Sequence, residues 1–272
     1  LLMQLIQIEP RLKPYIYVLD ISSSEKEALS QVAELTDALV VWGSDEAIAG
    51  VRQMAPTHLP IIEWGHRISF AYFTPNDRKE EDLNGLALDI CLSDQQYCSS
   101  PQCVFYETDD KEELSQFAYR LAKHIEQVSL KYPSTIQPKT VEAEITWIQE
   151  LVKMEEILDE KKLIKNENLG FSILIDYKAK LKASPLFRNI WLMPINREDI
   201  MDILRAHKGH LQTVGLSCSK KDKEELSRIF YVAGVNRINT CGKMADTYSG
   251  EPHDGFFTLR KYVRKVSRRL KC

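Results

Sequence analysis

The sequence predicts an α/β protein in which parallel strands alternate with helices. Short β-branched and aromatic runs alternate with longer amphipathic runs along most of the chain. The run ALVVW at residues 38–42 is apolar throughout, as expected of a strand with helices on both faces. With 272 residues, 44% of them hydrophobic, the chain is long enough for one large domain or two smaller ones.

Residues 1–64 are expected to form a strand, helix, strand, helix, strand series after a short opening helix. The opening helix is expected at residues 1–8 and the strands at residues 15–19, 38–42 and 60–63. The serines at positions 22–24 are expected to cap a helix with Glu25 and Glu27 in its first turn, where the helix dipole favours acidic side chains. So few parallel strands indicate the second half of a larger nucleotide-binding sheet.

The rest of the chain repeats this alternation in a second unit. Strands are expected at residues 68–73, 102–106, 171–176, 190–194, 212–216 and 236–239. Helices are expected at residues 82–92, 111–129, 141–159, 197–207 and 220–233. The connector at residues 131–140 contains prolines, which indicates a boundary between subdomains.

Composition excludes several classes of protein. The net charge of −3 does not suggest nucleic acid binding, and no apolar run approaches the roughly 18 residues of a membrane-spanning helix. The six cysteines have no framework spacing, and neither a CxxC motif nor a His pair at ligand spacing is present, so free thiols in a reducing cytoplasm are expected rather than disulfides or a zinc site. The start Leu1-Leu2-Met3, with no initiator methionine, indicates a fragment.

The C-terminal residues from Leu259 onward are strongly basic. They include seven Lys or Arg in fourteen residues, with Leu259, Val263, Val266 and Leu270 at helical spacing. This pattern predicts an amphipathic helix. Its basic face either contacts an anionic surface or is solvated while the apolar face packs on the protein.

Glu63 and Cys98 are the candidate catalytic pair. Glu63 ends an apolar strand, and Cys98 lies where a helical pattern stops ahead of the strand QCVFYE. A cysteine is nucleophilic as its thiolate, which neighbouring backbone N–H groups or positive charge favour. A carboxylate and a thiol from different segments are the minimum that covalent acyl chemistry requires.

With these residues aligned, the chain resembles the aldehyde dehydrogenase superfamily and, more closely, the acyl-CoA reductases of the LuxC family, which make fatty aldehyde for bacterial luminescence. The similar segments are VVWGSDEAI, PIIEWGHRISFAYF, LALDICLSDQQYCSSPQCVFYE, LQTVGLSCSKKDKEELSRIFYVAGVNRIN and SGEPHDGFFTLRKYVR. The resemblance implies the second part of a Rossmann-type nucleotide-binding domain at residues 1–62, an α/β catalytic domain at residues 63–240, and a C-terminal loop and basic helix at residues 241–272. The residues for the adenosine ribose and one amide of the oxyanion hole would precede Leu1.

The resemblance also implies a mechanism and a site. Cys98 would attack the thioester of an acyl-CoA or an acyl-protein, and its backbone N–H would stabilise the oxyanion. NADPH, or alternatively NADH, would then reduce the acyl-cysteine. Gly43 and Ser44 would lie at the cofactor pyrophosphate, Glu63 would relay protons, and His253 would lie at the mouth of the active site. A homodimer or tetramer paired through the last strands is a further implication.

One segment departs from the superfamily. Where many aldehyde dehydrogenases carry a glutamate ahead of Phe-Gly-Pro to hold the nicotinamide ribose, this chain reads FRNIWLMP from Phe187. The role of that glutamate therefore cannot be transferred to this chain.

Three alternatives remain open at the level of sequence. The first is a cysteine acyltransferase or thioesterase that uses Cys98 with His253 or His66 and no nicotinamide. The second is a non-catalytic fragment or scaffold. In the third, Glu63 satisfies strand-end amides, Ser44 is a routine helix cap, and His253 is a turn residue bonded to Asp254.

Overall fold

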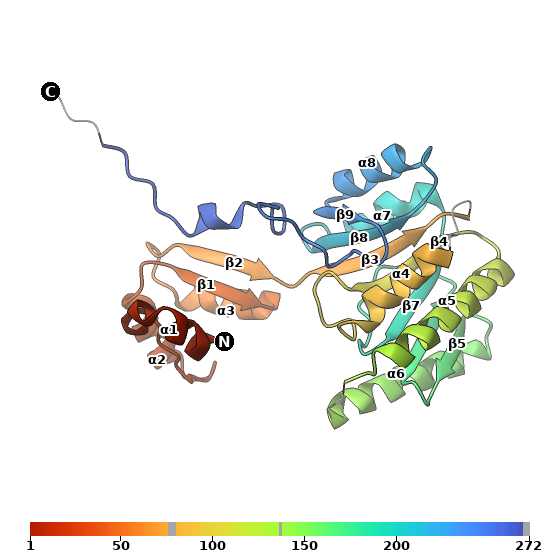
Figure 1. Ribbon diagram of the computed structural model, residues 1–272, viewed down its shortest axis with the longest axis horizontal. Coiled ribbons are helices and arrows are strands. Elements are labelled where there is room, and N and C mark those ends of the chain that lie inside the picture. Colours follow the sequence, from red (N-terminus) through yellow and green to blue (C-terminus); the bar gives the residue numbers. More distant parts are fainter. Residues whose placement is uncertain (76–79, 136–137, 269–272) are drawn as a thin grey trace. The chain divides into compact units, whose positions relative to one another are not determined.

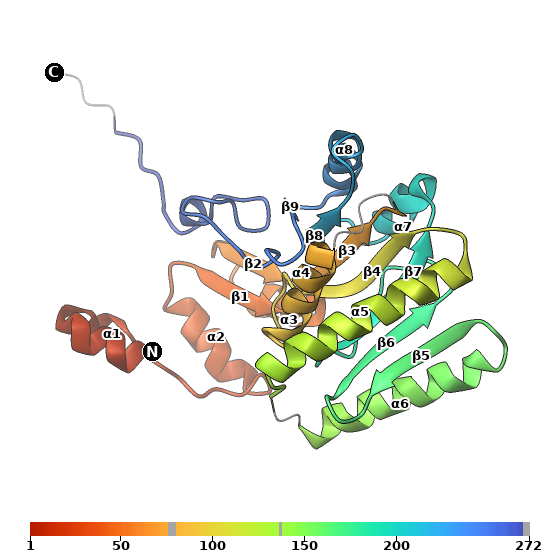
Figure 2. The ribbon, with the colours of Figure 1, turned by 45° about the vertical axis from the view of Figure 1, so that its right-hand side comes forward.

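The computed structural model describes residues 1–75, 80–135 and 138–268, which divide into two compact units, Leu1–Gly65 and His66–Cys272. Figures 1 and 2 show the elements of each unit. Among the described residues, no helix has both the length and the apolar character needed to cross a bilayer.

The smaller unit is built around one parallel βαβ motif. Its elements are α1 (Leu2–Ile8), a 3₁₀ helix (Pro10–Tyr15), α2 (Lys26–Glu34), β1 (Leu39–Gly43), α3 (Asp45–Met54) and β2 (Ile61–Gly65). β1 and β2 pair in parallel from Leu39 opposite Ile61 to Gly43 opposite Gly65. The side chains of Val41, Ile48 and Ile62 are buried between the two strands and α3. This confirms the predicted strand, helix, strand series at residues 38–63.

The predicted strand at residues 15–19 is wrong. Tyr15 ends a 3₁₀ helix, residues 16–19 have no regular structure, and Tyr17, Val18 and Leu19 are each more than 60% exposed. A β-branched and aromatic run becomes a strand only where a neighbouring strand pairs with it and covers its side chains. No such neighbour exists among the described residues of this unit.

Two further details of the smaller unit differ from expectation. The helix expected to be capped by serines begins at Lys26, and the hydroxyls of Ser22 and Ser24 instead bond to each other at 2.8 Å. β1 is not covered on both faces within the unit, because Trp42 is 66% exposed while Val41 is buried. An apolar strand sequence therefore does not by itself prove two covered faces.

The larger unit contains a doubly wound sheet of seven strands. The strands are β3 (Ile68–Phe73), β4 (Pro101–Glu107), β5 (Lys161–Asn166), β6 (Phe171–Asp176), β7 (Asn189–Ile195), β8 (Leu211–Ser217) and β9 (Arg237–Asn239). Their order is β5-β6-β7-β4-β3-β8-β9, and all neighbours pair in parallel except β5 with β6. The helices are α4 (Glu80–Cys91), α5 (Lys111–Lys131), α6 (Lys139–Glu156), α7 (Ile200–Arg205) and α8 (Lys223–Ala233).

Two hydrophobic cores lie on opposite faces of this sheet. On one face, α4 and α5 pack side by side over residues such as Phe73 and Tyr106 (Figures 1 and 2). On the other face, α7 and α8 cover residues such as Phe70 and Phe105. Successive strand residues point to opposite faces, which is why six consecutive apolar or small residues in β3 are all buried.

The sequence analysis missed β5 and misjudged the connector at residues 131–140. β5, with the sequence KKLIKN, is a lysine-rich antiparallel edge strand, so it lacks the apolar run that marks a central strand. The connector is not a subdomain boundary, because β4 before it pairs directly with β7 after it in one sheet. The predicted positions of the other six strands of this unit are confirmed.

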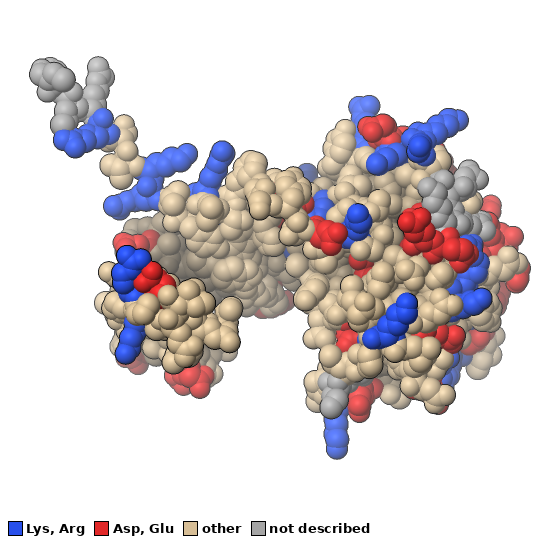
Figure 3. Space-filling model, in the orientation of Figure 1, with Lys and Arg blue, Asp and Glu red and all other residues tan. Residues whose placement is uncertain are grey.

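The predicted C-terminal helix is also wrong over the described residues. A single 3₁₀ turn at Thr258–Lys261 is followed by residues 262–268 without helix, and Leu259, Val263 and Val266 are more than 60% exposed. Lys and Arg gather on this segment in Figure 3. Like charges three and four residues apart oppose a helix, and so short a helix is unstable in water without a packing partner. Leu270 lies outside the described residues.

Candidate active site

Cys98 lies in the nine-residue loop between the end of α4 and the start of β4, and it is exposed. Its carbonyl oxygen accepts a hydrogen bond from the Ser69 hydroxyl at 2.6 Å, and the Ser69 oxygen in turn accepts the Thr213 N–H at 3.1 Å. The pairing of β3 shifts register at Ser69 against both neighbouring strands. Irregularities of this kind redirect a side chain out of the regular ladder. The Cys98 peptide is thus fixed while its thiol remains accessible.

The Cys98 backbone N–H has no acceptor among the described residues of the chain. A donor left open next to an exposed thiol is the arrangement needed to stabilise an oxyanion formed at that sulfur. The thiol itself forms no hydrogen bond with a histidine in the described part of the chain. The loop therefore leaves an exposed thiol beside an open backbone N–H, with no Cys-His hydrogen bond among the described residues.

Three other cysteines of the larger unit are poor nucleophiles. Cys91, Cys103 and Cys241 are buried, and burial raises the pKa of each thiol, to about 12 for Cys103. A thiol with a raised pKa is seldom ionised near neutral pH, so these three cysteines are weak nucleophiles. Cys218 is partly buried, and Cys272 lies outside the described residues.

Glu63 lies near the end of β2, in the smaller unit, and its carboxylate is held by Arg52 from the last turn of α3. The guanidinium binds it through one edge, with Nε donating to one oxygen and Nη2 to the other, the second at 2.6 Å. The hydrogen bond to Glu63 raises the pKa of Arg52. The sequence analysis missed Arg52, since nothing in a linear sequence shows that the end of this helix lies over the neighbouring strand. Glu63 and Cys98 belong to different units.

Gly43 and Ser44 form the turn from β1 into α3. The Ser44 hydroxyl accepts the Ala47 N–H at 3.3 Å, so it caps the helix as the simplest sequence interpretation suggested. A Cβ on residue 43 would come within 3.0 Å of the Ala47 side chain, which explains the glycine. A tight turn between a strand and a helix N-terminus can in general bind an anion, but here Asp45 and Glu46 add negative charge to the first turn.

His253 begins a tight turn in the loop before the C-terminal segment. His253 and Phe256 exchange two backbone hydrogen bonds of 2.9 Å, with Asp254 and Gly255 at positive φ between them, as in a type I′ turn. The His253 ring lies 3.9 Å from the Asp254 carboxylate. Asp254 is buried and fixes the turn to the sheet through Arg67 at 2.9 Å and Gln212 at 2.8 Å.

His66, which only the acyltransferase or thioesterase alternative placed at the site, stacks on His210. The ring centroids are 4.4 Å apart, and a His210 ring nitrogen lies 3.4 Å from the His66 carbonyl oxygen. This contact ties the start of β3 to the residue before β8. The stacking gives His66 a structural role in the larger unit.

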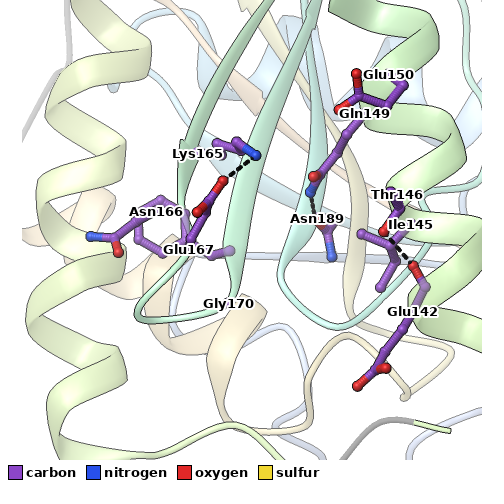
Figure 4. Close-up of a pocket in the computed structure, with 11 residues that line it drawn as sticks. Glu142, Ile145, Thr146, Gln149, Glu150, Lys165, Asn166, Glu167, Gly170 and Asn189 are labelled. Carbon is purple, nitrogen blue, oxygen red and sulfur yellow. Dashed lines mark hydrogen bonds and ion pairs between the residues drawn. The ribbon is translucent and has the colours of Figure 1, made fainter. Parts of the chain in front are cut away.

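A pocket of about 380 Å³ lies between α6 and the turn that joins β5 to β6 (Figure 4). It is lined by Glu142, Ile145, Thr146, Gln149, Glu150, Lys165, Asn166, Glu167, Gly170, Phe171 and Asn189. The Gln149 amide donates to Asn189 at 3.1 Å across its wall, and Lys165 pairs with Glu167 at its rim. None of the residues predicted for the site lines this pocket.

Comparison with solved structures shows the class of fold. Proline utilization A of Bradyrhizobium japonicum matches with a TM-score of 0.64 and 15% identity over 86% of this chain and 25% of that protein. A glyceraldehyde-3-phosphate dehydrogenase of Methanocaldococcus jannaschii, complexed with NADP, matches with a TM-score of 0.57 and 13% identity over 80% of this chain and 49% of the other. The fold of the chain is that of the aldehyde dehydrogenases, as the resemblance implied.

Comparison of sequences shows the family to which the chain belongs. Residues 1–265 match the family model described as acyl-CoA reductase (LuxC), and the chain belongs to that family. Its relatives include the long-chain acyl-protein thioester reductases of Aliivibrio fischeri, 28% identical over 89% of this chain, and of Vibrio harveyi, 26% identical over 90%. The chain spans about half the length of these curated relatives, 49% and 50%.

Proposed function

We propose that this protein reduces a long-chain acyl thioester to the fatty aldehyde through an acyl group carried on Cys98. The observation that carries the proposal is the exposed Cys98 thiol, set on a peptide that Ser69 holds, in a chain of the LuxC family. The relatives named long-chain acyl-protein thioester reductases support this substrate class. Acyl-CoA and acyl-protein thioesters carry the same reacting group, and both are proposed as substrates.

In the proposed reaction, the Cys98 thiolate attacks the thioester carbonyl carbon, and the carbonyl electrons move to its oxygen, next to the Cys98 N–H. The oxyanion collapses, the original C–S bond breaks, and the departing thiolate takes a proton. The acyl group is then a thioester of Cys98. Hydride and a proton convert this thioester to a thiohemiacetal. Loss of the hydroxyl proton and cleavage of the C–S bond release aldehyde and return the Cys98 thiolate.

A bound nicotinamide cofactor supplies the hydride, and we propose NADPH, with NADH as the alternative. Gly43 and Ser44 would hold its pyrophosphate, because they form a tight turn before the N-terminus of the ten-residue helix α3. In this proposal the smaller unit, together with its βαβ motif, is the latter part of the nucleotide-binding domain. Solved neighbours complexed with NAD or NADP support a nicotinamide cofactor.

Glu63 is proposed to relay the protons that accompany aldehyde release. Arg52 holds its carboxylate in a bidentate pair, which orients it for the relay. The proposed relay is distinct from activation of water, which would hydrolyse the acyl-enzyme. His253 is proposed to line the mouth of the site, and a cytoplasmic homo-oligomer is the proposed form of the protein.

A thioesterase or acyltransferase that uses Cys98 with a histidine receives less support. His66 stacks on His210, and His253 lies in a hydrogen-bonded turn beside Asp254. Among the described residues, neither histidine forms a hydrogen bond with the Cys98 thiol. A Cys-His hydrolase normally needs that contact to make its nucleophile.

The test compares wild-type protein of full natural length with its Cys98→Ala variant. Each is incubated with a long-chain acyl-CoA and NADPH, while NADPH oxidation, free thiol and aldehyde are measured together. The proposal predicts equal amounts of all three from wild type and none from the variant, with Cys103→Ala as a control that retains activity. Release of free thiol without NADPH oxidation would instead identify a thioesterase.

A further inference from the structure

The loop that presents Cys98 contains two non-glycine residues in the left-handed region of the backbone map. Asp94 has φ of 49° and Gln95 has φ of 62°. This conformation is unfavourable for residues with a Cβ, and it persists where surrounding contacts enforce it. The position of Cys98, only a few residues later, therefore depends on contacts from outside its own loop.

A second loop, at residues 184–188 just before β7, supplies these contacts. Three consecutive residues in it are also left-handed: Leu186, Phe187 and Arg188. The Phe187 N–H donates to the Asp94 carbonyl at 2.9 Å, and the Gln95 side-chain amide donates to the Ser184 hydroxyl at 3.3 Å. The two strained loops, about ninety residues apart in sequence, are thus bonded to each other.

A buried ion pair joins the same two loops. Arg188 Nε lies 2.6 Å from Asp94 Oδ1, and the side chains are 1% and 3% exposed. Arg188 also donates to the carbonyls of Cys91 at 3.3 Å and Tyr132 at 2.7 Å, so it spans the end of α4, the end of α5 and the loop of Cys98. The second Asp94 oxygen accepts both the backbone N–H and the hydroxyl of Thr135.

Both charges of this pair are compensated. Burial opposes the ionisation of Asp94, but the hydrogen bonds from Thr135 and Arg188 outweigh it and lower the pKa of Asp94. Replacing a buried ion pair by apolar residues of similar volume often leaves a protein equally stable or more stable. Stability alone therefore does not explain the pair. What the pair adds is a fixed geometry, with the planar guanidinium holding three segments at once.

We propose that Asp94 and Arg188 are positioning residues for Cys98, which hold its loop so that the sulfur and the adjacent N–H meet the thioester carbonyl. This inference rests on the proposed function of Cys98. It also gives a role to the segment that starts at Phe187, where the resemblance to aldehyde dehydrogenases fails. In this chain, that segment serves the nucleophile loop.

The test uses the double variant Asp94→Leu/Arg188→Met in protein of full natural length, so that no buried charge is left without its partner. Circular dichroism and thermal unfolding establish that it folds. The second-order rate of acyl-adduct formation at Cys98 from a long-chain acyl-CoA is measured by rapid quench and intact mass, and KM is measured in the steady state. A parallel assay measures the rate of Cys98 alkylation by iodoacetamide, which requires neither cofactor nor acyl substrate.

The positioning role predicts that the folded double variant acylates at least about tenfold more slowly, because small displacements of a reacting group cost rate, while KM changes little. Arg188→Lys, which keeps the charge but loses the planar fork, is expected to fall between the double variant and wild type. It also serves as the test if the double variant does not fold. The control is Arg197→Met, which breaks the pairs with Glu107 and Asp222 at the opposite end of β4 and is expected to lower stability without changing acylation.

Equal acylation rates in wild type and in a folded double variant, or in wild type and Arg188→Lys, would contradict the positioning role and leave the proposed function intact. An equal slowing in Arg197→Met would also contradict it, because the effect would then follow stability in general. Wild-type protein that alkylates at Cys98 but forms no acyl adduct would overturn the proposed function, and the positioning role with it.

Discussion

At the scale of single residues, Cys98 differs from the other described cysteines of the larger unit in its exposure and in what holds its backbone. Cys91, Cys103 and Cys241 face the core, whereas Cys98 lies on a loop whose carbonyl is bound by Ser69. The sequence made Cys98 the candidate nucleophile because it lies between a helical run and a strand. It did not reveal Ser69, because a serine within an apolar strand gives no sign that the strand is irregular there.

The relay role of Glu63 predicts a specific kinetic defect. Glu63→Gln is expected to form the acyl adduct at close to the wild-type rate and to release aldehyde roughly 100-fold more slowly, since a positioned proton-transfer group contributes that order of rate. Quenched-flow measurement of both steps in one experiment separates them. Loss of adduct formation in Glu63→Gln, or unchanged aldehyde release, would contradict the relay.

Asp89 predicts a dependence of stability on pH. Its carboxylate is buried against the backbone N–H groups of Gly242 and Met244, and burial raises its pKa to about 7. Between pH of about 4 and 7 the folded state keeps a proton that the unfolded state releases, so this residue's contribution to stability falls as pH rises through that window and is constant above it.

The measurement is urea unfolding of wild type and Asp89→Asn at several pH values. Relative to the variant, the free energy of unfolding of wild type is expected to fall as pH rises from about 4 to about 7. The fall is on the order of 4 kcal/mol at most. Parallel stability curves for the two proteins would show that Asp89 does not titrate in this range. The side-chain amide of the variant retains an oxygen acceptor, so the comparison isolates the charge.

At the scale of elements, α4 is held against the loop that follows β9 by a contact that leaves no room for a side chain. A Cβ on Gly85 would lie 2.5 Å from the Cys241 carbonyl oxygen and 2.9 Å from the Gly242 nitrogen. Both atoms belong to the backbone and cannot rotate away. This close approach fixes the helix that leads into the loop of Cys98.

Gly85→Ala is therefore expected to destabilise the larger unit by about 1–3 kcal/mol through overpacking. Gly50→Ala in α3 provides the opposite case, because nothing lies within 4 Å of the new methyl group, and removing a helical glycine is expected to stabilise by roughly 0.5–1 kcal/mol. Both are measured by chemical denaturation. A neutral or stabilising Gly85→Ala would contradict the close packing.

Elements with strong local signals could be predicted from the sequence, and elements that depend on distant partners could not. β3 and β6 match their predicted limits because each is an apolar run bounded by polar residues. β5 was missed because its charged residues suit an edge, and the run at residues 15–19 was mistaken for a strand although no neighbour pairs with it among the described residues. The ion pair of Asp94 and Arg188 joins residues 94 positions apart, and no local pattern reports it.

At the scale of the whole molecule, the two units differ in the number of their strands and in how well their apolar side chains are buried. The larger unit has seven strands with helices and a buried core on both faces, whereas the smaller has two strands and exposed apolar side chains such as Trp42 and Tyr17. A two-stranded sheet is rarely stable alone. The larger unit is expected to fold and remain stable without the smaller one.

Residues 66–272 expressed alone are therefore expected to unfold in one cooperative transition, and residues 1–65 alone to show none. Circular dichroism during heating measures both. A fragment of residues 66–272 without a cooperative transition would contradict the independence of the seven-stranded unit. The same preparation, if folded, also tests whether the loop of Cys98 keeps its structure, through the rate of Cys98 alkylation.

The central claim is that Cys98 carries the acyl group, and the most direct measurement is the site of the adduct. Protein of full natural length is exposed to a long-chain acyl-CoA without NADPH, digested, and mapped by peptide mass. A Cys98 acyl-enzyme predicts one acyl group on the peptide that contains Cys98, lost on addition of NADPH with release of aldehyde, and absent in Cys98→Ala. An acyl group on another residue, or one that persists in Cys98→Ala, would contradict it.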